Sequence, residues 1–280
     1  MAANYWASSQ YKHWLFSRQQ LEKTRLDTEV QTGYSRSELG DPRHLRIFFH
    51  TLIQALGRHL SVRQQALATA EVYLMRFYTR SAVQESNPYL VLATCVYLAC
   101  KTEECPQHIR SVVSEAKSLW PDYITHDATK LAECEFYLIE ELDSYLVVHH
   151  PYRSLSQLSK ALGAFGSNTG LSFEEMQTAW SVINDCFITD LPLLYPPHVI
   201  ALASIYFSVV IKTASIAVVP QSGRVRTRIN KIIEWFSSCG IDLDDVVECT
   251  QEVISLYEVW DSYSERSCRD IIAKFVIGKR

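Results

Sequence analysis

The sequence predicts an all-α fold of two tandem five-helix bundles preceded by an additional N-terminal helix. Apolar residues recur at intervals of three and four residues along most of the chain, and strand-like alternation is scarce. One helical pattern also occurs twice, because Pro88–Tyr97 aligns with Pro197–Tyr206 and Glu140–Tyr145 aligns with Glu258–Tyr263. Repetition of this length indicates that one fold was duplicated.

Length and charge limit the classes of function. The chain has 280 residues, 48% of them hydrophobic and 21% charged, which suits two domains of roughly 100 to 150 residues each. Its 27 basic and 31 acidic residues give a net charge of -4, so we expect no direct binding to nucleic acid. The two most apolar stretches, Leu90–Cys100 and Val199–Ile211, are shorter than the ~20 residues of a membrane-spanning helix, so we expect core helices and no membrane partner.

The N-terminal region, 1–41, is expected to form an amphipathic helix over about 3–26 and a polar linker from Asp27 to Asp41. The first bundle is assigned to 42–147. Pro88 and Pro106 mark helix starts, because the first residue of a helix does not need its N–H. The five helices of this bundle are predicted over 42–58, 62–80, 88–103, 106–119 and 127–143.

The second bundle is assigned to 148–263, and a C-terminal tail to 264–280. Pro151 and Pro197 mark helix starts in the same way. The five helices of this bundle are predicted over 152–163, 173–189, 197–212, 229–238 and 242–263. The third helix of each bundle is apolar on nearly all sides, and such a helix must be surrounded by others. We therefore expect it to be the central helix of its bundle.

Two local patterns predict how helices start and approach one another. Ser61-x-x-Gln64 and Ser172-x-x-Glu175 fit capping boxes, in which the hydroxyl and the later side chain satisfy each other's backbone donors. Small residues in the third helices allow close packing of their neighbours. These residues are Ala93, Ala99, Ala201 and Ala203.

An insertion distinguishes the second copy from the first. The two prolines are 109 residues apart but the two Asp-Ser-Tyr triplets are 118 apart, so nine extra residues separate the third and fifth helices of the second copy. We place them in Thr213–Asn230, a loop rich in helix breakers that contains Arg226 and Arg228. A solvated insertion and a contact with an acidic partner both fit this composition.

A lysine and a glutamate occur in the first copy alone. In the register of the repeat, Lys101 falls opposite Val210 and Glu135 opposite Val253. A residue that the fold requires would be required in both copies, so we expect this pair to act on a partner. The alternative for Lys101 is a solvated helix end that pairs with one of the two glutamates following it.

No catalytic centre, metal or cofactor is predicted. The eight cysteines include no CxxC pair and lie mostly in apolar runs, which is typical of reduced, buried cysteines. A metal site at Cys100 and Cys105 would lack a second pair of ligands. The chain has no Ser/His/Asp ordering, no GxxxxGK[ST] phosphate loop and no HExxH motif, so we expect it not to be an enzyme.

Three segments of the first bundle resemble the cyclin box. Leu98-Ala-Cys-Lys-Thr-Glu-Glu104 is preceded by Tyr73-Leu-Met-Arg-Phe-Tyr78 and followed by Glu133-Cys-Glu-Phe-Tyr-Leu138. The similarity extends over the second bundle and covers about 42–263. It implies two tandem five-helix cyclin boxes, of which the first binds a kinase.

Two further segments are similar to one subfamily, the fungal cyclins of the C type. They are Ala3-Asn-Tyr-Trp-Ala-Ser-Ser-Gln10 and Asp190-Leu-Pro-Leu-Leu-Tyr-Pro-Pro-His-Val-Ile-Ala-Leu202. This resemblance implies a noncatalytic subunit that binds and activates the Mediator-associated cyclin-dependent kinase, regulates transcription by RNA polymerase II in the nucleus, and contacts other Mediator kinase-module subunits.

Two alternatives remain. Other transcriptional cyclins, of the H, K, T or L type, share the double box and would bind a different kinase. A general transcription factor of the same repeat type would bind promoter DNA, but it should have a zinc ribbon before the repeats and a basic face along them. Neither feature is present in the sequence.

The resemblance implies that Lys101 and Glu135 bind the mobile helix of the kinase N-lobe, with Glu104 as a further contact. An ammonium offers three donors to the carbonyls that a helix leaves unsatisfied at its C-terminal end. A carboxylate accepts from backbone N–H groups or from a basic side chain. Held inward, the kinase helix completes the internal Lys–Glu pair that positions the nucleotide phosphates.

The substrate-docking patch of cell-cycle cyclins differs in this chain. Its Met-Arg-Ala-Ile-Leu pattern is replaced by Leu45-Arg-Ile-Phe-Phe49. Ile47 stands at the alanine position and would crowd a shallow groove. We therefore expect no substrate docking there, and core packing for Phe48 and Phe49.

A possible partner groove is predicted in the second bundle. Trp180, Asn184 and Asp185 share one face of a helix, and Tyr257 joins them from the last helix of the box. A tryptophan beside polar groups is typical of protein interfaces. The alternative is a tryptophan packed between the bundles, with Asp185 capping a helix or paired.

A possible contact surface is also predicted near the N-terminus. Tyr5 and Trp6 begin a strongly aromatic side of the first helix. This helix folds back on its own box, covers the kinase, or binds another Mediator subunit. The sequence leaves these three alternatives open.

Overall fold

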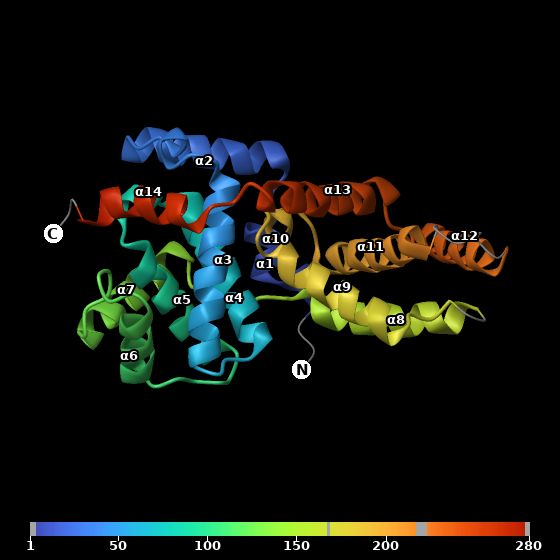
Figure 1. Ribbon diagram of the computed structural model, residues 1–280, viewed down its shortest axis with the longest axis horizontal. Helices are drawn as coiled ribbons and strands as arrows, with labels where there is room; N and C mark the ends of the chain where they lie inside the picture. Colours follow the sequence, from blue (N-terminus) through green and yellow to red (C-terminus); the bar gives the residue numbers. More distant parts are fainter. Residues whose placement is uncertain (1–3, 167–168, 217–222, 278–280) are drawn as a thin grey trace. The chain divides into compact units, whose positions relative to one another are not determined.

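The computed structural model describes residues 4–166, 169–216 and 223–277, and their side chains except those of 210–216, 223–226 and 277. Within these ranges the regular secondary structure is helical, which confirms the all-α fold class (Figure 1). The chain forms two compact units, one from Met1–Val148 together with Glu258–Arg280 and the other from His149–Tyr257.

All five predicted helices of the first box form. They are α3 (Pro42–His59), α4 (Gln64–Arg80), α5 (Pro88–Thr102), α6 (Ile109–Leu119) and α7 (Ala128–Glu141). Asn87 caps α5, because its side-chain oxygen accepts from the Tyr89 N–H at 3.1 Å. α6 begins three residues later than predicted, since the capping acceptor is the side chain of His108 and not a residue before Pro106.

The two predicted capping boxes have different outcomes. Ser172 and Glu175 form one at the start of α9 (Phe173–Cys186), with hydrogen bonds of 3.2 and 2.7 Å. The box at Ser61 and Gln64 is wrong, because Arg63 is the N-cap of α4 and makes no side-chain capping bond. Ser61 instead adopts a φ of 52° in the turn that follows α3.

The single N-terminal helix predicted over 3–26 is wrong, and so is the linker predicted from Asp27. The segment forms η1 (Tyr5–Ala7), α1 (Ser9–His13), α2 (Arg18–Thr32) and η2 (Arg36–Leu39). Ser8 and Ser17 interrupt the helix, because their hydroxyls cap α1 and α2 by accepting backbone N–H groups. Gly33 ends α2 in the left-handed conformation, with a φ of 72°.

The C-terminal tail predicted over 264–280 contains a further helix. α14 (Glu265–Ile277) packs against α3 and η3 (Val83–Glu85), and Figure 1 shows it beside α3. Cys268 and Ile272 lie four residues apart on the face of α14 that enters the core of the first unit. This narrow apolar stripe among charged residues is the signal that the sequence prediction missed.

The third helix of each box is its central helix, as predicted. In the first unit, α5 contacts α3, α4, α6 and α7. In the second unit, α11 (Pro197–Ile216) contacts α9, α8 (Pro151–Phe165) and α10 (Leu191–Leu194). The small residues at the contacts are buried, which lets the neighbouring helices approach closely. They are Ala93, Ala99, Ala201 and Ala203.

The second unit differs from its prediction after α11. The loop predicted over Thr213–Asn230 is wrong for the described residues, because α11 continues to Ile216 and α12 (Gly223–Ser238) begins before Asn230. Residues 217–222 and the side chain of Arg226 lie outside the described part of the chain. α12 is followed by α13 (Leu243–Trp260), and the short α10 was not predicted.

Arg228 pairs within its own unit, so neither a solvated role nor a contact with an acidic partner describes this residue of the basic segment. Its guanidinium donates to the two carboxylate oxygens of Glu175 at 2.8 and 2.9 Å. The side chain of Glu175 is 2% exposed. Burial opposes its charge, but the hydrogen bonds from Arg228 and the Ser172 N–H hold the pKa of Glu175 below its usual value.

The segment that replaces the docking patch of cell-cycle cyclins is buried. Phe48 is 1% exposed and Phe49 is 7% exposed, so their predicted core packing is confirmed. Ile47 is fully buried as well.

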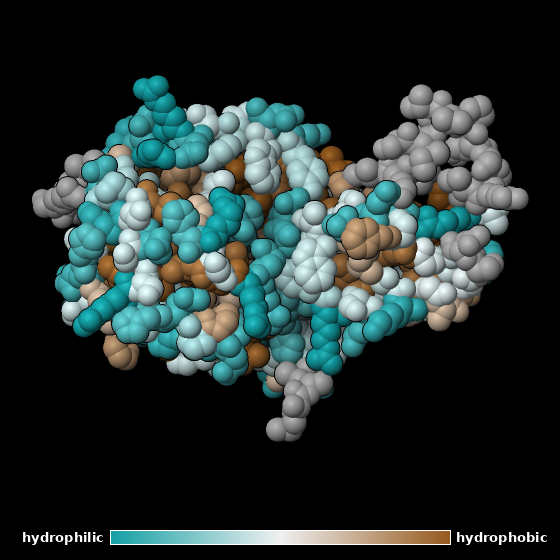
Figure 2. Space-filling model, turned by 60° about the horizontal axis from the view of Figure 1, so that its bottom comes forward, coloured by the Kyte–Doolittle hydropathy of each residue, from teal (hydrophilic) through white to brown (hydrophobic). Residues whose placement is uncertain are grey.

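On the face shown in Figure 2 hydrophilic side chains predominate, with apolar ones visible between them. Among the described residues, no helix is both long enough and apolar enough to span a membrane.

Candidate functional site

Two helices of the first unit bring Lys101 and Glu135 together. Lys101 lies in the last turn of α5, where a cation is favourable beside the carbonyl end of the helix. Its Nζ lies 2.6 Å from Oε1 of Glu135 on α7. The lysine side chain is 43% exposed and the glutamate side chain 11%. Glu135 is therefore buried, and Lys101 is the member of the pair that is accessible at the surface.

The ring of Tyr97 supports the lysine from the preceding turn of α5. The Lys101 ammonium lies 5.0 Å from the centre of this ring, within the range of a cation–π interaction. An ammonium has three N–H groups, and the hydrogen bond to Glu135 uses one of them. The arrangement can therefore present donors and carboxylate oxygens to the same partner segment.

Neighbouring glutamates have other roles. Glu103 accepts hydrogen bonds from the side chains of Gln65 and Thr69 at 2.6 and 2.7 Å, which fix the end of α5 to α4. Glu104 is exposed and has a φ of 54°, so it directs the chain out of the helix. Lys101 thus pairs with Glu135 and not with the glutamates that follow it.

The matching positions of the second unit are different. Val253, which the repeat places opposite Glu135, is 1% exposed and belongs to the core. The side chain of Val210, opposite Lys101, lies outside the described residues. At the position that corresponds to Glu135, the second unit therefore has a buried valine in place of the carboxylate.

The candidate residues of the second unit form two adjacent contacts at the end of α9. Trp180 stacks on Tyr152 with ring centres 4.6 Å apart, and the Tyr152 hydroxyl donates to Asn184 at 2.8 Å. The Tyr257 hydroxyl donates to Asp185 at 2.6 Å. Burial is the larger cause and the hydrogen bond to Asp185 the smaller cause that raise the pKa of Tyr257. Trp180 remains 41% exposed. The stacking on Tyr152 and the Tyr152–Asn184 hydrogen bond hold its ring in place.

Tyr152 was missed in the sequence reasoning, although it organises this group. It is 8% exposed and contacts both Trp180 and Asn184. Its position directly after Pro151, at the start of α8, was the available signal. No periodicity within one helix connects it to α9, so the contact depends on tertiary packing.

Near the N-terminus, Tyr5 and Trp6 form an aromatic cluster with Tyr11. The three rings meet edge to face, with centres 5.0 to 5.7 Å apart. Trp6 is 53% exposed. Tyr5 is less accessible, and burial raises its pKa to about 12. Trp6 is thus the most exposed member of the cluster, and Tyr11 is 39% exposed beside it.

The same segment is anchored on the first unit by Trp14, which is fully buried. The guanidinium groups of Arg76 and Arg80 lie 5.0 and 4.5 Å from the Trp14 ring. Arg76 is 1% exposed and donates to the Tyr145 carbonyl at 3.1 Å. Burial lowers the pKa of Arg76 to about 10. The N-terminal segment therefore folds back on its own box, which was one of the three alternatives.

Two further residues escaped the sequence reasoning. Arg76 stands within the apolar run Tyr73–Tyr78, and a charge in such a run was a signal of a buried role. Phe136 is 75% exposed and follows Glu135 directly on α7. A large exposed aromatic ring one residue from Glu135 on α7 is a further candidate for contact with a partner.

The structure contains no arrangement typical of a metal centre in its described ranges, where no three His, Cys, Asp or Glu side chains are placed to hold an ion. All eight cysteines are free thiols. Burial raises the pKa of Cys95 well above its usual value and that of Cys100 to about 12. These thiols are therefore neutral core residues at pH 7.

Comparison with known proteins agrees with this architecture. The family described as "Cyclin, N-terminal domain" matches residues 14–147. A chain of the yeast TFIIK complex superimposes with a TM-score of 0.65 at 23% identity, covering 89% of this chain and 100% of that one. A chain of the CAK complex from Chaetomium thermophilum gives a TM-score of 0.64 at 20% identity, covering 96% and 79%. At these identities the likeness shows the fold.

Curated proteins of similar sequence share a higher identity with this chain than these solved structures do. A protein of Yarrowia lipolytica is 51% identical over 99% of this chain and 100% of its own length. A protein of Aspergillus fumigatus is 47% identical over 100% of this chain and 99% of its own length. Both are described as an RNA polymerase II holoenzyme cyclin-like subunit. The chain therefore belongs to the cyclin family, together with these RNA polymerase II holoenzyme cyclin-like subunits.

Proposed function

We propose that this chain is the noncatalytic, C-type cyclin of the Mediator kinase module, which binds and activates the cyclin-dependent kinase of that module in the nucleus. The observation that carries the proposal is the ion pair of Lys101 and Glu135, whose carboxylate has no counterpart in the second unit. The names of the fungal relatives, which match over nearly their whole length, support a role in transcription by RNA polymerase II.

The ion pair is suited to hold the end of a helix. The last four carbonyls of an α-helix lack partners within the helix, and an ammonium can donate to more than one of them. The Lys101 side chain is accessible enough to do so while it keeps its bond to Glu135. The exposed ring of Phe136, one residue from Glu135 on α7, is a further candidate for apolar contact. Together they bind a helix end with a defined register.

Activation follows from the position of the captured helix. In a protein kinase, a glutamate of this helix pairs with the lysine that contacts the nucleotide phosphates. A cyclin that holds the helix inward stabilises that pair and contributes no catalytic group of its own. The accessible ammonium of Lys101 can turn toward a partner, while the buried Glu135 stays in place.

The second unit and the N-terminal segment offer surfaces for other kinase-module subunits. Trp180 is partly exposed and is held rigid through Tyr152, Asn184 and the neighbouring Asp185–Tyr257 bond. A rigid, half-exposed tryptophan loses little conformational entropy when it is covered, which favours it as an anchor. Trp6 is a weaker candidate of the same kind.

The test is capture of the purified Mediator-type cyclin-dependent kinase by wild type and by Lys101→Glu and Glu135→Ala. We expect each variant to weaken binding by about 2 kcal/mol or more, roughly thirtyfold, because each leaves a charge or donor without its partner. Lys160→Glu is the matched control, since Lys160 is an exposed lysine of α8 in the second unit. Equal capture by all four proteins would contradict the proposal.

A further inference from the structure

α5 is buried on every side except one narrow stripe. Of its fifteen residues, only Leu90, Tyr97, Lys101 and the terminal Thr102 retain some exposure. Leu90, Tyr97 and Lys101 are seven and four residues apart, so they lie on one face of the helix. This α5 stripe runs from the first turn of the helix to the Lys101–Glu135 pair.

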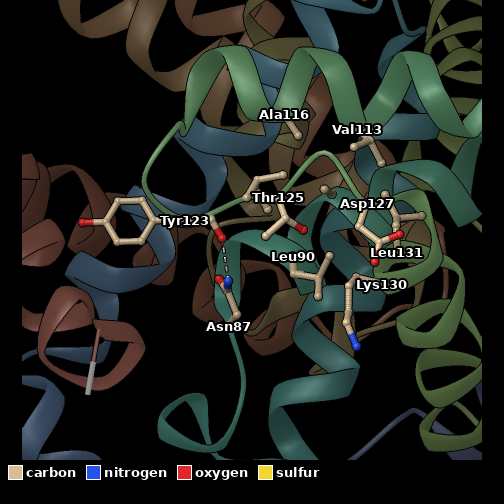
Figure 3. A pocket seen from close by; sticks show the side chains of 11 residues that line it. Asn87, Leu90, Val113, Ala116, Tyr123, Thr125, Asp127, Lys130 and Leu131 are labelled. Atoms are coloured by element: carbon tan, nitrogen blue, oxygen red, sulfur yellow. Dashed lines mark hydrogen bonds between the residues drawn. The ribbon is translucent and has the colours of Figure 1, made fainter. Parts of the chain in front are cut away.

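A pocket opens at the Leu90 end of the α5 stripe. It has a volume of about 310 Å³ and is bounded by α5, the C-terminal half of α6, the connection after α6 and the first turn of α7 (Figure 3). Figure 3 shows side chains from these four segments around one space. Its apolar wall is formed by Leu90, Ala93, Val113, Ala116, Ile124 and Leu131.

Three polar side chains at the rim, those of Asn87, Lys130 and Asp127, are engaged with the protein. Asn87 donates to the Tyr123 carbonyl at 2.8 Å, drawn as the dashed line in Figure 3. Lys130 pairs with Glu133 at 3.1 Å, and Figure 3 shows its ammonium directed away from the pocket. Asp127 caps α7. The pocket therefore lacks the converging charges that a phosphate or a metal ion requires, and its wall suits an apolar group.

The volume of the pocket, about 310 Å³, lies at the lower end of the ~300–1,000 Å³ range of small-molecule pockets. A space of this size suits one or two apolar side chains of a protein segment. Both the pocket and the Lys101–Glu135 pair are formed by residues of α5 and α7. A partner that lies along the α5 stripe would therefore contact both. Leu90 and Lys101 are eleven residues apart, about 16 Å along the helix. Three turns of helix or about five extended residues span that distance.

We propose that the pocket accepts an apolar side chain of the same kinase that contacts Lys101 and Glu135, so that the kinase is anchored at both ends of the α5 stripe. This inference rests on the proposed function, because it assigns the pocket to the partner of the ion pair. The ion pair fixes the register of the kinase helix, and the pocket adds affinity through burial of apolar surface. A charged side chain of the kinase at this point would be excluded.

The first test fills the pocket. Thr125 is an exposed residue of the pocket rim, and Thr125→Trp places a large ring over the opening. We expect at least tenfold weaker binding of the purified Mediator-type kinase. His126→Trp is the control, since His126 is exposed and adjacent in sequence but does not line the pocket. Both variants should unfold at the temperature of the wild type, because neither position is buried.

The second test needs no variant. Amide hydrogen exchange of residues 123–127 is measured in the full chain, alone and saturated with the purified kinase. We expect at least tenfold slower exchange in the complex. Unchanged exchange in a saturated complex overturns the inference, as does kinase binding by Thr125→Trp equal to that of His126→Trp. Slower exchange that depends on the concentration of this chain alone assigns the pocket to a second copy and also overturns it.

The two proposals fail separately. If Lys101→Glu binds the kinase as wild type does, the proposed function is wrong. If Lys101→Glu loses the kinase while Thr125→Trp keeps it, the ion pair is correct and only the pocket is misassigned. Loss of binding in both variants, with retention in His126→Trp, supports the two anchors together.

Discussion

The two central helices, α5 and α11, share a proline and a tyrosine at matching positions but place the tyrosine in different surroundings. Both begin at a proline and place a tyrosine in their third turn, Tyr97 in the first unit and Tyr206 in the second. The Tyr97 ring lies beneath the Lys101 ammonium at the surface. The Tyr206 ring instead meets Phe236 of α12 edge to face, with centres 6.1 Å apart. One position of the repeat supports a charge in the first unit and packs against a helix in the second.

The two units therefore differ in which residues stabilise the fold and which remain accessible to a partner. The second unit holds a salt bridge between buried Glu175 and Arg228, inside its own fold. The ion pair of the first unit has an accessible lysine, and this unit takes additional packing from the N-terminal segment and α14. The four predictions that follow test this division.

The largest expected effect is at Trp14 in the first unit. Trp14→Ala removes a fully buried ring and its contacts with Arg76 and Arg80, so we expect the free energy of unfolding to fall by about 5 kcal/mol. Urea denaturation measures it. Trp6→Ala is the control, with an expected change within about 0.5 kcal/mol, because Trp6 is half exposed. Similar losses at both positions would contradict the anchoring role.

In the second unit, Arg228→Ala leaves the buried carboxylate of Glu175 without its partner. We expect a loss of about 3 kcal/mol in the free energy of unfolding, since breaking a buried pair on one side exposes the full cost of the remaining charge. The double variant with Glu175→Gln should recover part of this loss. A single variant as stable as wild type would show that Arg228 is dispensable.

The same pair predicts a dependence on pH. The folded pKa of Glu175 lies below its usual value, so its stabilisation is fully present above the unfolded pKa of about 4.3 and is lost as pH falls through the folded pKa. In Arg228→Ala, burial without the partner raises the pKa of Glu175, so its carboxyl is protonated at a higher pH than in wild type. The stability difference between wild type and Arg228→Ala should therefore be largest near pH 7 and shrink steadily as the pH falls to about 4. Denaturation at several pH values checks this, and a difference that grows on acidification would refute it.

The smallest effect is expected at Lys101. Lys101→Ala should lower the free energy of unfolding by only about 1 kcal/mol, because the ammonium is 43% exposed and Glu135, at 11%, keeps more access to water than Glu175 at 2%. Thermal denaturation checks it. A loss of stability this small together with lost kinase binding would sharpen the contrast between a partly exposed pair and the buried pair of the second unit. A loss of stability as large as that of Arg228→Ala would remove the contrast.

Most helices could be predicted from the sequence, because apolar periodicity and capping residues are local signals. The starts of α3, α5 and α11 coincide with Pro42, Pro88 and Pro197. The N-terminal helix was predicted wrongly, since aromatic periodicity over 3–26 suggested continuity while the hydroxyls of Ser8 and Ser17 interrupt it. Periodicity shows that residues suit one face of a helix, but a local capping bond decides where the helix ends.

By itself, the sequence determined the helical class, the duplication, the two central helices and the asymmetry of Lys101 and Glu135, all of which depend on residues close together or on direct alignment of the repeats. The contacts between side chains of different helices followed from the packed fold alone. That fold placed Arg228 on Glu175, Trp14 on Arg76, and a pocket at the other end of the α5 stripe. These contacts join residues far apart in sequence, and the packing of whole helices, which no local pattern encodes, brings them within reach.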